Sequence, residues 1–100
     1  KIGAINFLMD ITPDCDCLGR SDASVVSDVG VLASDDMVAA DRASVDLINR
    51  QPSLCHTIIP DDKLEEPDKF TVIHGVDWRH QFAYAEQIGL GSAEYELRSL

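Results

Sequence analysis

The chain has 100 residues, of which 45% are hydrophobic, and a formal net charge of −10 at pH 7. This length allows one small domain, residues 1–100, around a single core. The acidic balance argues against nucleic acid and anionic membranes as partners, because both are bound by basic surfaces. No apolar run approaches the roughly 20 residues of a membrane span. A cation site or a basic partner remains compatible with this charge.

The first predicted element is a strand over residues 2–9. This run is almost wholly apolar, and Asn6 is its only strongly polar residue. Continuous apolarity over this length predicts a strand covered on both faces, as in a parallel sheet. A second β-like run, 25–33, follows a polar loop rich in turn formers. Because the chain enters its first strand almost at once, we expect it to be a fragment of a longer protein.

A helix over residues 37–50 is predicted next. Ser34, Asp35 and Asp36 precede it and are typical of a helix N-terminus, although both acids could also act as general bases or cation ligands. Asp41 falls in the middle of the apolar arc of this helix. A buried carboxylate is costly unless it is hydrogen-bonded, paired or bound to a metal, so Asp41 is open to a structural or a functional role.

The second half of the chain is less regular. A long polar connection, 51–69, leads to a short segment, 70–73, that we expect to be a strand or an extended packing segment. A capped helix follows at 78–88 and ends at Gly89, and an edge strand is expected at 93–98. The order of elements predicts an α/β (or α+β) class. It would be a small layered domain with a short, mostly parallel sheet and two main helices, as part of a larger fold.

Strand direction decides whether the chemistry-bearing residues meet. If the first two strands are parallel, the loop from Asp10 to Cys17 and the turn from Ser34 to Asp41 leave from the same edge. That edge is where open α/β sheets bind ligands. If the strands are antiparallel, the two features separate and the composite site fails.

The most specific local motif is Cys15-Asp16-Cys17. In an extended segment, both thiols point the same way and reach one zinc or other thiophilic divalent ion, or one iron–sulfur cluster. Two ligands are too few, so further ones are needed; the candidates are Cys55, His56 and Asp10. The alternative is a pair of small buried thiols at the base of a loop. Three cysteines, an odd number, favour a reducing, cytoplasmic setting over a secreted disulfide scaffold.

Three stretches carry a family resemblance: INFLMDITPDCDC, SDVGVLASDDMVAADRASVDLIN and DW…YAEQIGLGSAEYEL. Together they resemble the C-terminal part of uncharacterised iron–sulfur-centre proteins, catalogued as domain of unknown function family 362. The resemblance implies a ferredoxin-type cysteine region upstream, as the partner of this segment, and an iron–sulfur cluster in the full-length protein. It places five residues at characteristic family positions: Cys15, Cys17, Asp35, Asp36 and Asp41. The proline that commonly follows the second aspartate is Met37 here.

Three hypotheses for function follow. The leading one is a metal-binding or electron-transfer accessory module with Cys15 and Cys17 near the metal or a redox partner. The second is an acidic-crevice enzyme domain that uses Asp35, Asp36 and Asp41 with a divalent cation. The third is a structural or interaction domain, whose apolar strand pairs with the rest of the protein or with a second copy in a homodimer. None of them specifies a substrate or a reaction.

Overall fold

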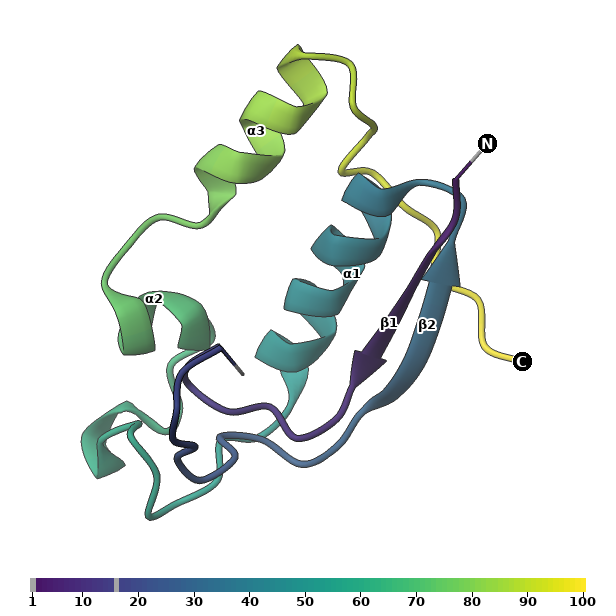
Figure 1. The fold of residues 1–100 in the computed structure, drawn as a ribbon. Helices are drawn as coiled ribbons and strands as arrows, with labels where there is room; N and C mark the ends of the chain where they lie inside the picture. Colours follow the sequence, from purple (N-terminus) through teal and green to yellow (C-terminus); the bar gives the residue numbers. More distant parts are fainter. Residues whose placement is uncertain (1, 16) are drawn as a thin grey trace.

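The computed structural model describes residues 2–15 and 17–100 (Figure 1). In these residues the chain forms two strands, three α-helices and one short 3-10 helix. Their bounds are β1 Ala4–Leu8, β2 Gly30–Ser34, α1 Met37–Arg50, the 3-10 helix Asp61–Lys63, α2 Lys69–His74 and α3 Arg79–Gln87. The fold is therefore α+β, with the helices on one side of a small sheet.

The sheet is antiparallel, and the prediction of a mostly parallel sheet is wrong. Ala4 pairs with Ser34 and Leu8 pairs with Gly30 in a two-stranded sheet of the described residues. Parallel neighbours need a crossover connection, usually a helix. The connection 9–29 contains no helix among its described residues, so the chain simply reverses direction.

Helix α1 covers the inner face of the sheet (Figure 1). Its bounds agree with the predicted helix. The residues that it buries are mostly small, and include Ala39, Ala40, Ala43 and Ser44. Small side chains let the helix approach the two strands closely. The Ser44 hydroxyl is also satisfied within the helix, because it donates to the Ala40 carbonyl at 2.7 Å.

The core joins the sheet and α1 to two of the connecting segments. It is formed by Leu8, Val25, Val26, Ile48 and Ile59, all of which are buried. Val25 and Val26 were expected in the second strand but lie in a bend instead. The Val25 amide donates to the Ile11 carbonyl, and the Val25 carbonyl accepts from the Leu54 amide, both at 2.9 Å. These bonds fix the long loops to the core.

The segment expected as a strand or extended at 70–73 is helical, as part of α2. The Asp68 side chain caps this helix by accepting from the Thr71 amide, and Gly75 ends it with a left-handed φ of 67°. Four residues are too few to show a helical or a strand periodicity. The two residues that mark the helix ends, Asp68 and Gly75, lie outside the segment 70–73.

Helix α3 confirms the predicted helix and its ending. The Gly89 amide donates to the Glu86 carbonyl and the Leu90 amide to the Ala85 carbonyl, the bond pair of a Schellman motif. The edge strand expected at 93–98 is wrong, because the described residues form only β1 and β2. This segment is held by side chains instead, and the Tyr95 hydroxyl donates to Asp46 of α1 at 2.7 Å.

Candidate functional site

The two groups of chemistry-bearing residues lie at opposite ends of the β1–β2 pair. The cysteine loop follows Leu8, which pairs with Gly30, whereas the acidic turn follows Ser34, which pairs with Ala4. The expectation that both face one crevice is therefore wrong. The antiparallel alternative, in which the composite site fails, is the one observed.

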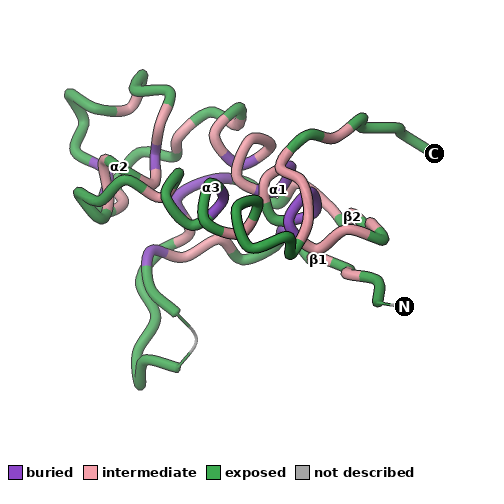
Figure 2. Tube along the Cα trace, turned by 90° about the horizontal axis from the view of Figure 1, so that it is seen from above, coloured by how far each residue is buried: buried purple, intermediate pink, exposed green. Residues whose placement is uncertain are grey.

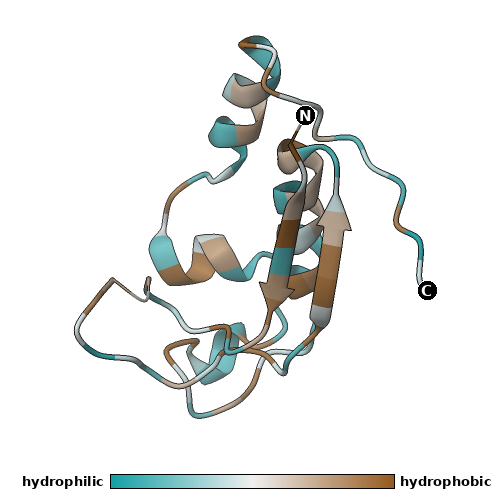
Figure 3. Ribbon diagram, turned by 45° about the vertical axis from the view of Figure 1, so that its right-hand side comes forward, coloured by the Kyte–Doolittle hydropathy of each residue, from teal (hydrophilic) through white to brown (hydrophobic). Residues whose placement is uncertain are grey.

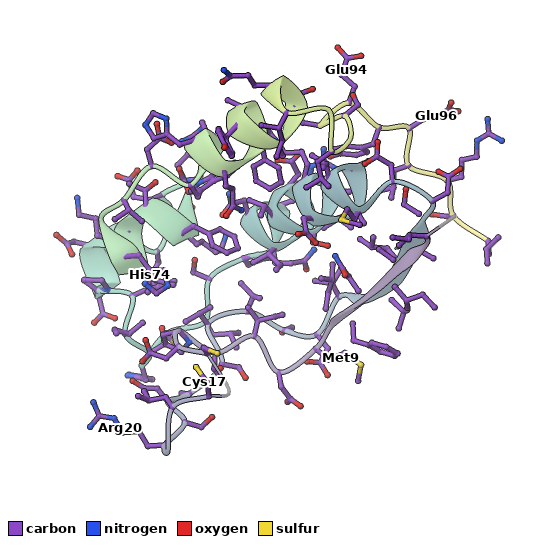
Figure 4. The ribbon with its side chains drawn as sticks, turned by 45° about the horizontal axis from the view of Figure 1, so that its top comes forward. Met9, Cys17, Arg20, His74, Glu94 and Glu96 are labelled. Atoms are coloured by element: carbon purple, nitrogen blue, oxygen red, sulfur yellow. The ribbon has the colours of Figure 1, made fainter. Side chains whose placement is uncertain are left out.

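The loop with Cys15 and Cys17 projects from the body of the molecule. Figure 2 shows it as an exposed extension, and both thiols are exposed. Figure 4 shows Cys17 on this loop, with the Arg20 side chain pointing outward nearby. The alternative of two buried thiols is therefore wrong. Asp16, the middle residue of the motif, lies outside the described residues.

A tight turn brings the two cysteines together. The Leu18 amide donates to the Cys15 carbonyl at 2.9 Å, and the Cys17 amide donates to the Cys15 sulfur at 3.2 Å. Sulfur accepts only weak hydrogen bonds. The two sulfur atoms are thus held as neighbours by a turn rather than by the extended segment that we expected.

The neighbouring Cys15 makes the Cys17 thiol harder to deprotonate. The Cys17 thiol donates a hydrogen bond to the Cys15 sulfur, and the negative charge of a Cys15 thiolate would repel one on Cys17. Both effects raise the pKa of Cys17 above its usual value. A soft cation that binds both sulfur atoms would remove this repulsion, and it would have to displace protons to do so.

The further candidate ligands are not gathered around this pair. Asp10 adopts a left-handed φ of 50°, and its amide donates to Asp28 at 2.9 Å, which closes the base of the loop. Cys55 and His56 are exposed in the connection after α1. The described residues contain no group of three or more His, Cys, Asp or Glu side chains placed to hold a metal ion.

An iron–sulfur cluster therefore does not fit this chain by itself. Such clusters are held by four protein ligands, mostly cysteines, and the sequence has three cysteines. Cys15 and Cys17 are two neighbouring soft donors, half the number that a tetrahedral thiolate site requires.

Asp36 is fully engaged within the fold. One carboxylate oxygen accepts from the Val38 and Ala39 amides at 2.9 and 3.2 Å, and the other accepts from the Ser92 amide at 2.8 Å. The Ser92 bond and then the Ala39 bond hold the pKa of Asp36 below its usual value. These bonds give Asp36 a structural role as the N-cap of α1. The bond to Ser92 could not be predicted from the sequence, because the two residues are far apart in it.

Asp41 is exposed, so the expectation that its carboxylate is buried is wrong. It lies beside a groove between α1 and α3. The Asn6 side-chain amide donates to Asp41 at 3.0 Å and to the Ser44 hydroxyl at 2.9 Å. Asp35 is also exposed. Asn6 is the only strongly polar residue of an apolar strand, and this feature of the sequence could have revealed it as the partner of Asp41.

A polar cluster around Asp68 was missed by the sequence analysis. Asp68 accepts from the Trp78 indole at 2.9 Å, the Thr71 hydroxyl at 2.8 Å and the Arg79 guanidinium at 3.1 Å. Partial burial raises the pKa of Asp68, but these hydrogen bonds together outweigh it and leave the pKa lowered. The cluster joins α2 to α3, and the spacing of Asp68 and Thr71 is a capping pattern that could have revealed it.

Residues 2–46 match the model of the family described as Domain of unknown function (DUF362). This part of the chain is similar to the DUF362 family. The match covers β1, the cysteine loop, β2 and most of α1, and the family description assigns no activity. No curated protein and no solved structure matches the chain. Among the helices of the described residues, none has the length and apolarity needed to cross a membrane.

Proposed function

We propose that the cysteine loop of this DUF362 segment is one half of a metal site. Cys15 and Cys17 supply two thiolate ligands to a thiophilic ion, and a second polypeptide segment supplies the remaining donors. The observation that carries this proposal is the pair of exposed thiols, which the turn holds side by side. Two neighbouring thiolates form a chelate that favours soft ions over hard ones.

The surroundings of the pair support this role. The loop lies outside the core, so a partner can reach the thiols without rearranging the fold. The chain is strongly acidic, which raises the local concentration of cations. The family resemblance makes an upstream ferredoxin-type region the expected source of the other ligands. A complete site there would serve electron transfer, and a reducing compartment such as the cytoplasm would keep the thiols available.

Cobalt titration tests the ligand role directly. Cobalt(II) bound by thiolates shows sulfur-to-metal charge-transfer absorption in the near ultraviolet, and it replaces zinc in tetrahedral sites. We expect the full chain to develop this absorption with one ion per two chains, because each chain provides two of four donors. Replacing both Cys15 and Cys17 by serine should weaken binding at least about 100-fold.

Cys55→Ser is the matched control, because Cys55 is also an exposed thiol but lies in a different connection. It should leave the spectrum and the affinity unchanged. Equal loss in Cys55→Ser and in the Cys15 and Cys17 variants would contradict a site built on the pair, as would unaltered absorption in the double variant.

A further inference from the structure

Lys69, the first residue of α2, is the only buried charged residue in the described part of the chain. It exposes 4% of its surface. Its Nζ amine donates to the Asn49 carbonyl near the end of α1 at 2.8 Å, and no ion pair of the described residues includes it. Lysine is rarely buried to this extent without an opposite charge beside it, so this side chain calls for an explanation.

A small cavity lies beside this lysine, between α2, the end of α1 and the loop after β1. Its volume is about 50 Å³, and apart from Lys69, Thr12 and His74 every residue that lines it is apolar. Figure 3 shows the hydrophobic colouring of α2, which forms one of its walls. The cavity is partly open to solvent, and its one exposed lining residue is His74, at the end of α2 (Figure 4).

These surroundings favour a neutral, nucleophilic amine. Burial removes water from the ammonium form and lowers the pKa of Lys69 below its usual value. A neutral amine has two hydrogens and a lone pair, so it can donate to the Asn49 carbonyl and still attack an electrophile. Desolvated lysines of this kind form Schiff bases with carbonyl compounds. A largely apolar cavity, in turn, suits a neutral ligand better than an anion.

The size of the cavity restricts the ligand. One water molecule needs roughly 10–15 Å³ of such space, so the cavity has room for about three or four non-hydrogen atoms. Sugars and pyridoxal phosphate are too large for it. An aldehyde with a short carbon chain fits.

We propose that Lys69 is a Schiff-base site for small neutral aldehydes, which bind in the cavity between α2 and the loop after β1. The amine nitrogen forms a bond to the carbonyl carbon, and one amine proton moves to the oxygen. The hydroxyl then leaves as water with the second amine proton, and a C=N bond results. Protonation of the imine by solvent restores one N–H, which can again donate to the Asn49 carbonyl. The step needs no oxidant or reductant.

Reductive trapping of the full chain with acetaldehyde and cyanoborohydride tests the proposal. Hydride from cyanoborohydride converts an imine into an ethylamine, which peptide mass spectrometry locates in the sequence. Of the three lysines, Lys1, Lys63 and Lys69, Lys63 is exposed and serves as a control within the same molecule. At neutral pH and short times, Lys69 should be ethylated at least about 10-fold faster than Lys63, because its amine is neutral more often and the cavity holds the aldehyde beside it.

Benzaldehyde, which is too large for the cavity, should show no preference for Lys69. Acetaldehyde should show none either in the chain unfolded by guanidinium chloride. Lys69→Arg keeps a donor for the Asn49 carbonyl but forms no imine, and it should leave the labelling of Lys63 unchanged.

Equal or slower ethylation of Lys69 would overturn the proposal and leave its side chain as a cap on the end of α1. A preference that persists with benzaldehyde or in the unfolded chain would also overturn it, since the cavity would not be the cause. The result is independent of the proposed metal site, because a chelator is present throughout and neither Cys15 nor Cys17 lines the cavity.

Discussion

The acidic start of α1 and the cysteine loop are both conspicuous in the sequence, and the structure uses them differently. The Asp36 carboxylate accepts three backbone hydrogen bonds, and Asp41 accepts one from Asn6. Cys15 and Cys17 are exposed on a projecting loop, where the Cys17 amide donates a hydrogen bond to the Cys15 sulfur. The carboxylates thus hold the fold together, whereas the thiols remain accessible to an incoming ion.

This difference follows from the physical chemistry of the two groups. A carboxylate at a helix start satisfies amides that would otherwise lack partners, so the fold gains stability from it. A thiol is a weak hydrogen-bond donor and acceptor and contributes little in that way. Placing two of them together in an exposed turn raises the pKa of Cys17. Substitutions in the acidic start of α1 should therefore change stability, whereas substitutions in the cysteine loop should change metal binding.

The largest effect on stability is expected at Asp36. Asp36→Ala removes the acceptor for Val38, Ala39 and Ser92 at once, and with it the bond that ties Ser92 to the start of α1. The midpoint of thermal unfolding should fall by roughly 5–10 °C in circular dichroism. Cobalt binding by the cysteine loop should be unchanged at temperatures where the variant is folded. Loss of binding in the folded variant would show that the two regions are not independent.

Acid should produce a smaller effect with a defined origin. Because the folded pKa of Asp36 is lowered, its stabilising contribution is present above the unfolded pKa of about 4 and is lost as pH falls through the folded value. The unfolding midpoint should therefore drop between about pH 5 and pH 3 in the wild-type chain. Asp36→Asn should show a shallower drop, with a remainder from Asp68, whose pKa is also lowered. Identical profiles for the two proteins would contradict the assigned role of Asp36.

The smallest effect is expected at Asp41. Asp41→Asn keeps an oxygen that can accept from Asn6, and the position is exposed. The free energy of unfolding should change by less than about 0.5 kcal/mol in urea denaturation. A decrease in the free energy of unfolding several times that size would contradict this minor role and indicate that the Asp41 carboxylate is essential to the fold.

Local and non-local features of the fold differed in how well they could be predicted. Helix α1 was predicted with its observed bounds, because its period and its capping aspartate lie within one short segment. The direction of the sheet was predicted wrongly. The continuous apolarity of β1 indicated a strand covered on both faces, whereas Ile5 and Phe7 lie on an exposed outer face. Asp41 was misplaced because its partner, Asn6, lies 35 residues away in the sequence. The proximity of Cys15 and Cys17 could be predicted because the two residues are close in the sequence, although a turn rather than an extended segment brings them together.

The division between structural carboxylates and available thiols is tested most directly by comparing cadmium binding in three proteins by calorimetry. These are the wild-type chain, the double variant Cys15→Ser with Cys17→Ser, and the double variant Asp36→Asn with Asp41→Asn. The account predicts that the serine variant loses at least about 100-fold in affinity while the asparagine variant binds like the wild type. Retained binding in the serine variant together with loss in the asparagine variant would contradict it and return the carboxylates to the role of metal ligands.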